Sequence, residues 1–173
     1  MKIRAAAPAD TEAIGRVHVE TWRSAYRGLV SDAYLAGLSP AERAARWRTF
    51  LAERDPARVL LVAEDDVEGV IGFAAAGPER SGDPKYRGEI YAIYVMRSHQ
   101  RHGCGRELMR AASRRLAAVR FPSMRLWVLD ANAPARAFYE VLGGTVLRRQ
   151  PIEIGGAPLA EVAYGWSDLT ILV

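Results

Sequence analysis

The amino-acid sequence predicts a mixed α/β sheet with helices on both faces, and three observations lead to this fold class. Apolar runs of strand length alternate with stretches in which apolar residues recur at helical spacing. Two tight turns, Asp65–Gly69 and Gly155-Gly156, join pairs of apolar runs into hairpins. The segment Ser39-Pro40-Ala41-Glu42 begins a helix, with a serine cap, a proline at the first helical position and a glutamate at the third.

The expected elements follow one another with short connections. A strand over 2–5 precedes a helix capped by Asp10 or Thr11, and helices over 31–37 and 40–54 follow. The first hairpin has strands over 58–64 and 70–76; next come a strand over 89–95, a helix over 104–119 and a strand over 124–129. A helix capped by Asn132 runs to Leu142 and leads into the last hairpin, over 144–154 and 157–166. Helix 104–119 is expected to bury one apolar face, made of Met109, Ala112, Leu116 and Val119.

Length and composition are those of an ordinary globular protein. The 173 residues, 50% hydrophobic and 25% charged, suit one domain over residues 1–173. The first residues, MKIRAAAPAD, lack the apolar region of a signal peptide, and no run approaches the ~20 apolar residues of a membrane span. The single cysteine cannot form an internal disulfide. We therefore expect a cytoplasmic protein with no membrane partner.

Positive charge gathers in one part of the chain. The formal net charge is +4, and 22 of the 24 basic residues are arginine. Eight arginines and one acid, Glu107, lie between Arg97 and Arg125, and a field of this sign would attract a polyanionic ligand. Nucleic acid would be attracted too, but the segment has no zinc-finger, homeodomain or RNP aromatic pattern. We therefore expect no nucleic-acid partner.

The segment Gln100–Arg106, QRHGCGR, stands between the strand over 89–95 and the helix that starts at 104. A strand, a glycine turn and a helix start can aim several backbone N–H groups at one anion, and the helix N-terminus adds partial positive charge. Gly103 and Gly105 would let the main chain approach a phosphate and adopt positive φ. A pyrophosphate is therefore predicted to lie on the N–H groups of about Arg101, Gly103, Cys104, Gly105 and Arg106.

Two familiar pyrophosphate motifs do not fit this turn. A P-loop ends in Gly-Lys-Ser/Thr, whereas this turn ends in Gly105-Arg106-Glu107. The dinucleotide fingerprint requires a third glycine where Leu108 stands, and an acidic residue about 20 positions later, where Phe121-Pro122-Ser123 lies. A glycine-rich turn without any ligand is the remaining alternative.

Gln100, Gly103 and Gly105 resemble the coenzyme A loop, Gln/Arg-x-x-Gly-x-Gly/Ala, of the GNAT N-acetyltransferase superfamily. The strand EIYAIYV before this loop resembles the GNAT strand that runs beside pantetheine. The segment 128–144 resembles the second signature, Asn…Ala-x-x-Phe-Tyr-x-x-x-Gly-Phe, and 3–10 resembles the usual opening, so the resemblance covers about residues 2–167. Gly144 departs from the family, which usually carries an aromatic residue there, and looser packing below the last helix is expected.

The resemblance implies a mostly antiparallel central sheet that splays at the fourth strand, beside a bulge that frees backbone groups. Pantetheine would pair with the strand edge as an added strand would, on the N–H groups near Ile93, Tyr94 and Val95. One of these groups would also stabilise the oxyanion of the attacked thioester. The acetyl-CoA-binding residues that the resemblance further implies are Gln100, Arg101, His102, Gly103, Cys104, Gly105, Arg106, Asn132, Arg136 and Tyr139.

Two residues carry the chemistry that the resemblance implies. Tyr139 would protonate the departing thiolate, and it shares a helix face with Asn132 because the two lie seven residues apart, about 10 Å along the axis. Both also have structural interpretations, Asn132 as an N-cap and Tyr139 as a core residue. Glu89 is the leading candidate for the base that takes a proton from the amine, or else a charge at a strand start. Weaker candidates for the base are Glu20, Asp32 and Glu153.

The remaining candidates concern the acceptor and other chemistries. Trp22 and Tyr26 would form a wall of the acceptor site, although an aromatic pair at this spacing also suits core packing. Cys104 stands at a helix start, where a thiolate is favoured, but no histidine and aspartate arrangement accompanies it, so no covalent catalysis is expected. The histidines at 18, 99 and 102 lack a metal-ligand spacing, so no metal is expected.

The function that follows is acetyl-CoA-dependent transfer of an acetyl group to a primary amine, by direct attack in a ternary complex. A non-catalytic acyl-CoA-binding regulatory module of the same fold is the alternative, and Tyr139 argues against it. The acceptor would be a small-molecule or peptide amine that no motif identifies. Dimers are common in the superfamily, so a homodimer is open.

Overall fold

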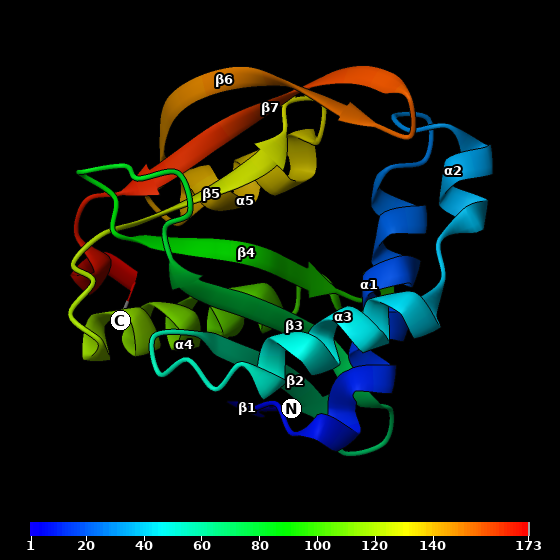
Figure 1. The fold of residues 1–173 in the computed structure, drawn as a ribbon, viewed down its shortest axis with the longest axis horizontal. Coiled ribbons are helices and arrows are strands. Elements are labelled where there is room, and N and C mark those ends of the chain that lie inside the picture. The colour runs from blue at the N-terminus through cyan, green and yellow to red at the C-terminus, as the bar shows by residue number, and fades with distance from the viewer. Residues whose placement is uncertain (173) are drawn as a thin grey trace.

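The computed structural model describes residues 1–172, and its seven strands form one sheet in the order β1-β2-β3-β4-β5-β7-β6 (Figure 1). The strands are β1 (Lys2–Ala5), β2 (Val59–Asp65), β3 (Gly69–Pro78), β4 (Gly88–Val95), β5 (Met124–Leu129), β6 (Thr145–Ile154) and β7 (Ala157–Trp166). The α-helices are α1 (Thr11–Ala25), α2 (Asp32–Gly37), α3 (Pro40–Ala52), α4 (Cys104–Ala118) and α5 (Ala133–Val141). Short 3₁₀ turns lie at Pro8–Asp10, Arg97–His99 and Leu169–Leu172.

The predicted fold class is confirmed, and every expected strand and α-helix is present. The caps follow the sequence pattern: the Ser39 hydroxyl accepts a hydrogen bond from the Glu42 N–H at 3.3 Å. One expected core residue is corrected, because Val119 lies at the C-cap of α4 and is only half-buried. The 3₁₀ turns at 97–99 and 169–172 carry no strong sequence signal and were not anticipated. No helix within residues 1–172 has the length and apolar character needed to cross a membrane.

The sheet opens into two arms between β4 and β5. Within the described residues these strands form the one parallel pair, and they pair only at Gly88↔Met124, Glu89↔Arg125 and Ile90↔Leu126. Both strands then continue without pairing, β4 to Val95 and β5 to Leu129. On the other edge of β4, Ala75 pairs with Ala92 and Ala76 with Ile90, which makes Tyr91 the extra residue of a β-bulge. The splay expected at the fourth strand is therefore present.

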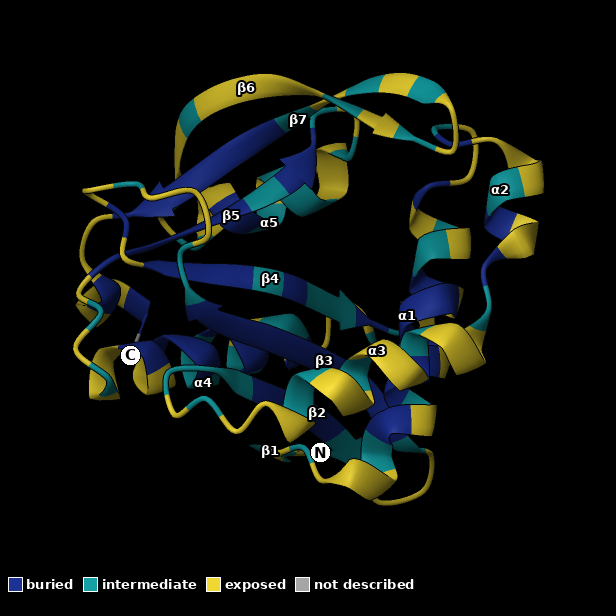
Figure 2. Ribbon diagram, viewed as in Figure 1, coloured by how far each residue is buried: buried dark blue, intermediate teal, exposed yellow. Residues whose placement is uncertain are grey.

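Helices cover both faces of the sheet (Figures 1 and 2). On one face, α1 and α3 pack on the alternate residues Leu60, Val62 and Phe73 of β2 and β3. On the other face, α4 packs on the opposite alternate set, and Tyr139 of α5 belongs to the same core. The buried strands run through the middle of the molecule, whereas β6 is mostly exposed (Figure 2).

Gly144, between α5 and β6, is tightly packed, and the expectation of looser packing there is corrected. A Cβ at this position would lie 2.6 Å from Cζ2 of Trp166 and 2.9 Å from the carbonyl oxygen of Tyr139. Trp166 is buried and donates from Nε1 to the carbonyl oxygen of Leu142 at 2.9 Å. The indole of Trp166 on β7 therefore fills the space below α5, and a side chain at 144 would displace it.

Replacing Gly144 with alanine should lower the free energy of unfolding by about 1–3 kcal/mol, because the added methyl group meets a backbone carbonyl and a rigid indole. Urea denaturation measures this change. Gly37→Ala is the matched control, since a Cβ at Gly37, the last residue of α2, would meet nothing within 4 Å. If both substitutions changed the free energy of unfolding equally, the tight packing described for Gly144 would be contradicted.

His18 of α1 is buried among aromatic rings. Its ring centroid lies 4.9 Å from that of Tyr94, 5.8 Å from Trp22 and 5.9 Å from Trp47. Trp47 Nε1 donates to His18 Nδ1 at 3.2 Å, which places the proton of the neutral ring on Nε2. Burial, aided by the charges of Arg43 and Arg46, lowers the pKa of His18 to about 3.

The pKa of His18 predicts a pH dependence of stability. Between pH 6.5 and pH 3, His18 is protonated in the unfolded chain but neutral in the native chain. The free energy of unfolding therefore falls as pH decreases from 6.5 towards 3. His18→Gln keeps an acceptor for Trp47 and should remove about 2 kcal/mol of the stability difference between pH 7.5 and pH 5.0, measured by urea denaturation. The exposed His102 is the control, because His102→Gln should leave that difference unchanged. A wild-type pH slope in His18→Gln would contradict the assignment.

Candidate functional site

The splay leaves backbone groups of β4 without strand partners. Met96 donates its N–H to the carbonyl of Ile71 at 2.9 Å, and pairing directions alternate along an antiparallel ladder. Tyr94, paired with Phe73, therefore also turns its peptide groups towards β3, while Ile93 and Val95 turn theirs towards β5, which does not pair with them. The expectation for the Tyr94 N–H is thus corrected, and the open edge of β4 belongs to Ile93 and Val95.

The loop after β4 presents a row of free donors. Within residues 1–172, the backbone N–H groups of the six residues from Arg101 to Arg106 donate to no protein acceptor, and the first helical bond of α4 runs from Glu107 N–H to Gly103 O at 3.1 Å. Gly103 is the N-cap with φ +86°, and Arg101 also has positive φ, +66°. Alternating left-handed residues before a helix turn successive N–H groups to one side, which forms a concave anion site.

The residues inside this loop have different tasks. Gln100 donates from Nε2 to the carbonyl of Val95 at 3.0 Å, so its amide ties the loop to the end of β4. Gly105 lies within α4 without positive φ, and a Cβ there would lie 3.1 Å from Cζ of Phe138. Its absence of a side chain serves the close packing of α4 against α5, rather than the turn itself. Arg101, His102 and Arg106 are exposed around the free N–H groups.

Cys104 is buried at the start of α4, with 2% of its surface exposed. Burial raises the pKa of its thiol to about 11. Desolvation therefore outweighs the positive end of the helix, which alone would favour the thiolate. A protonated thiol is a poor nucleophile. Cys104 therefore offers the loop its backbone N–H group and not a reactive sulfur.

Helix α5 places Asn132 and Tyr139 as two ends of one face. Asn132 is the N-cap, and its Oδ1 accepts from the Ala135 N–H at 3.3 Å. Tyr139 is 6% exposed, with its ring 5.8 Å from that of Tyr164 and 6.3 Å from that of Trp166. Burial, aided by the neighbouring Tyr94 hydroxyl, raises the pKa of Tyr139 well above 10, so its hydroxyl stays protonated at neutral pH.

Arg136 of α5 is held within the protein. Its Nη1 donates to Asp130 Oδ1 at 2.7 Å and its Nε donates to the Tyr164 hydroxyl at 3.1 Å. These bonds join α5 to the end of β5 and to β7. Its guanidinium is therefore already engaged by two partners within the protein.

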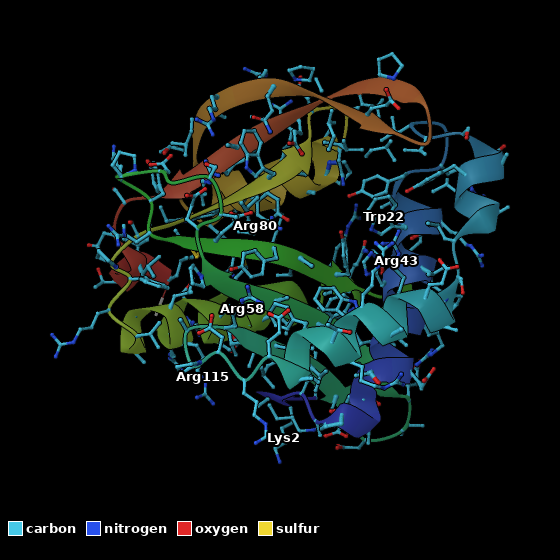
Figure 3. The ribbon with its side chains drawn as sticks, viewed as in Figure 1. Lys2, Trp22, Arg43, Arg58, Arg80 and Arg115 are labelled. Carbon is cyan, nitrogen blue, oxygen red and sulfur yellow. The ribbon has the colours of Figure 1, made fainter. Side chains whose placement is uncertain are left out.

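Aromatic hydroxyls from three elements converge between the arms of the sheet. Burial raises the pKa of Tyr26 well above 10, the neighbouring hydroxyls of Tyr94 and Tyr139 add to this, and the side chain of Asn132 opposes it. Trp22 packs edge-on against Tyr26, with ring centroids 4.8 Å apart. The structure thus brings α1, β4 and α5 together at one place. Figure 3 shows Trp22 beside Arg43, whose guanidinium carbon lies 5.6 Å from the indole centroid.

Glu89 lies at the base of the splay and is 2% exposed. Its carboxylate accepts from the backbone N–H of Arg80 at 3.2 Å and from the guanidinium of Arg80. The other candidate carboxylates, Glu20, Asp32 and Glu153, are exposed on α1, α2 and β6. Among the four candidates, only Glu89 is both buried and open to a pocket.

Sequence reasoning missed most of this pocket, which has a volume of about 290 Å³. Besides Glu89, its walls include Arg80, Arg125, Trp127, Arg148 and Glu161. These residues come from the loop after β3, from β5, β6 and β7, so only the strand pairing brings them together. One signal was available: Arg125 and Trp127 alternate with Met124, Leu126 and Val128, so they occupy the opposite face of β5.

The arrangement combines three chemical capacities. The concave row of N–H groups suits a diphosphate, because backbone donors at a helix start hold such anions. The open edge of β4 suits an extended amide-containing chain, which can pair as a strand does. A buried protonated phenol, Tyr139, and a pocket carboxylate, Glu89, lie on opposite faces of the splayed strands and suit acid–base chemistry.

This chain belongs to the acetyltransferase (GNAT) family, whose model matches residues 19–143. It is 35% identical over 170 residues to the uncharacterized N-acetyltransferase YuaI of Bacillus subtilis (strain 168), across 98% of this chain and 95% of that protein.

Two solved structures share the fold at lower identity. The ribosomal-protein-alanine N-acetyltransferase from Brucella melitensis has a TM-score of 0.76 at 19% identity, across 96% of this chain and 99% of that one. The PaiA N-acetyltransferase from Thermoplasma acidophilum, solved in complex with coenzyme A, has a TM-score of 0.72 at 20% identity, across 92% and 96%.

Replacing Gly103 with valine should weaken the binding of coenzyme A at least about 100-fold, because a β-branched residue strains the left-handed N-cap and turns its N–H groups away. Isothermal titration calorimetry with coenzyme A measures the affinity, and circular dichroism checks that the fold is retained.

Gly156→Val is the matched control for this substitution. Gly156 has φ +78°, and a Cβ there would meet nothing within 4 Å, so the valine carries the same backbone strain at the turn between β6 and β7. This variant should bind coenzyme A as the wild type does. Normal binding by Gly103→Val would refute the anion site.

Proposed function

We propose that this protein transfers the acetyl group of acetyl-CoA to a primary amine by direct attack in a ternary complex. The observation that carries the proposal is the row of free N–H groups from Arg101 to Arg106, together with the open edge of β4 and the buried Tyr139. Membership of the acetyltransferase (GNAT) family supports it, as does the coenzyme A complex of the PaiA relative in fold.

The chain would bind acetyl-CoA mainly through its backbone. The diphosphate would lie on the N–H groups at the start of α4, with the exposed guanidiniums of Arg101 and Arg106 beside it. The pantetheine amides would pair with the peptide groups of Ile93 and Val95, which β5 leaves open. Gln100 would position the loop rather than touch the ligand, because its amide already binds Val95.

Tyr139 would act on the sulfur. Burial keeps the phenol protonated, so it can donate a hydrogen bond to the thiolate as the carbon–sulfur bond breaks. A phenol with a pKa above 10 gives up its proton uphill to a thiolate whose conjugate acid has a pKa of about 8.5. Its first contribution would therefore be to stabilise charge on sulfur, while the N–H of Ile93 or Val95 stabilises charge on the thioester oxygen.

Glu89 would accept the proton that the attacking ammonium must lose. One proton passes from the ammonium to the carboxylate, and the neutral nitrogen then bonds to the carbonyl carbon. The carbon–sulfur electron pair leaves with the sulfur, and the thiolate takes the second proton that the nitrogen loses as it becomes an amide. Arg80 must first give up the Glu89 carboxylate. Its side chain is 64% exposed, so it has room to move.

The alternative of a non-catalytic acyl-CoA-binding module is not favoured. Such a module needs the loop and the open strand edge, but it has no use for a buried phenol and a buried carboxylate on the two faces of the same splay.

Thiol release from acetyl-CoA across a panel of amines tests the proposed function. The wild type should release thiol with at least one amine, and Tyr139→Phe should lower kcat about 100-fold with little change in affinity for acetyl-CoA. Glu89→Gln should lower kcat as well, and the loss should not be relieved by raising the acetyl-CoA concentration.

The outcomes separate the possible roles. Binding of acetyl-CoA without thiol release for any amine would support the regulatory module. An unchanged kcat in Tyr139→Phe would remove Tyr139 from the reaction while leaving acetyl transfer in place. Phe121→Leu, a change in a half-buried residue before β5, serves as a control for general effects of aromatic substitution.

A further inference from the structure

The pocket at the base of the splay carries guanidinium groups that the acetyl-transfer chemistry does not use. It opens beside Glu89 and is lined by Arg80, Arg125 and Arg148, which come from the loop after β3, from β5 and from β6. Its volume of about 290 Å³ suits a small molecule rather than a folded partner. Figure 3 shows Arg80 beside β4, away from Trp22 and Arg43 on α1 and α3.

Two of these guanidiniums share one aromatic ring. The guanidinium carbons of Arg125 and Arg148 lie 5.4 Å and 5.3 Å from the ring centroid of Trp127. Arg148 is exposed, and within residues 1–172 it forms no ion pair and no side-chain hydrogen bond. The indole therefore holds a guanidinium whose donors remain free at the pocket wall.

Arg125, in contrast, is held in place by carboxylates of the loop after β3. Only 3% of its side chain is exposed; it forms an ion pair with Glu79 and lies 3.5 Å from Asp83. Burial alone would raise the pKa of Glu79, but hydrogen bonds from Ser81 and Asp83 and the charge of Arg125 lower it to about 2. The Nε of Arg125 is nevertheless buried without a partner. A buried donor of this kind at a pocket wall calls for an acceptor, either water or a ligand.

The same pocket also has an acidic side. Glu89 lies at its inner end, and Glu161 lines it from β7, where it accepts from Gln150 Nε2 at 2.7 Å. Positive and negative groups thus stand on different walls of one small pocket. A ligand that carries one charge of each sign matches this arrangement better than a simple cation, which would meet three guanidiniums.

We propose that the acceptor is a small amine that also carries a carboxylate, as an amino acid does, and that Arg148 is the residue that selects it. This rests on the proposed acetyl transfer. The carboxylate would bind the free guanidinium of Arg148, while the ammonium group faces Glu89. Arginine suits this task because its planar donors bind both carboxylate oxygens together.

Arg80 links the two ends of the acceptor. In the absence of an acceptor it pairs with Glu89 and lies 4.5 Å from the ring centroid of Tyr91. An incoming carboxylate competes with Glu89 for this exposed guanidinium. Once Arg80 has changed partners, Glu89 is released to take the ammonium proton. With an amine that has no carboxylate, Glu89 is released only when Arg80 moves away by itself, so turnover should be less efficient.

The experiment compares matched acceptors. Each of a set of amino acids is assayed against its own amide and its own decarboxylated amine, which keep the side chain and remove the negative charge. For the best amino acid, the kcat/KM of the wild type should be at least about tenfold above the values for the corresponding amide and decarboxylated amine. Arg148→Gln should raise KM for that amino acid about tenfold and leave the values for the amide within about twofold.

Arg114→Gln is the charge-matched control. Arg114 is exposed on α4, on the far side of the sheet from the pocket, and the substitution removes the same charge. It should keep the wild-type preference. Equal use of the amino acid, its amide and the decarboxylated amine would overturn the proposal, as would an equal loss on the acid and the amide in Arg148→Gln.

Calorimetry separates this proposal from the proposed function. Protein saturated with coenzyme A is titrated with the same amino acids, so that binding is read without turnover. Suppose that the wild type binds an amino acid, that Arg148→Gln does not, and that no amine causes thiol release from acetyl-CoA. This result would support the amino acid site at Arg148 and contradict the proposed acetyl transfer. Thiol release with simple amines, together with no binding of any amino acid, would support acetyl transfer and contradict the amino acid site.

Discussion

The loss of hydrogen bonds between β4 and β5 beyond Ile90 and Leu126 is the constraint on which the rest of the site depends. A continuous parallel ladder would saturate the peptide groups of Ile93 and Val95. The bulge at Tyr91 accompanies this opening, because an extra residue bends a strand and increases its local twist. Unpaired backbone groups are costly when buried, so the open edge persists only where water or a ligand completes it.

Burial sets the protonation of the groups around this opening. The phenols of Tyr26 and Tyr139 are kept neutral because burial disfavours their charged forms, and the same effect keeps His18 uncharged. Charge is instead carried by the groups that reach solvent or pair with one another, such as Arg80 with Glu89. The site therefore has a neutral aromatic region around Tyr26 and Tyr139 and a charged pocket at the base of the splay.

Local sequence signals anticipated the parts of the site that lie within one segment. The glycine loop, the Asn132 cap and the position of Tyr139 on α5 are each encoded by spacing over a few residues. The peptide direction of Tyr94 was not, because it depends on a register against β3 that the sequence does not reveal. The pocket of Arg80, Arg125 and Arg148 was missed for the same reason, since strands distant along the chain assemble it. The engagement of Arg136 by Asp130 and Tyr164 likewise needs three elements in place.

The state of Cys104 has a practical consequence for the bench. It is the one cysteine of the chain, it is buried under Gly72 of β3, and burial raises the pKa of its thiol to about 11. Reagents that report free sulfhydryl groups attack the thiolate, which this residue hardly populates near neutral pH. In the folded protein Cys104 would therefore react little with such reagents, and their signal would come from coenzyme A that is released. Colour that grows with the protein alone, without acetyl-CoA, would then signal unfolding.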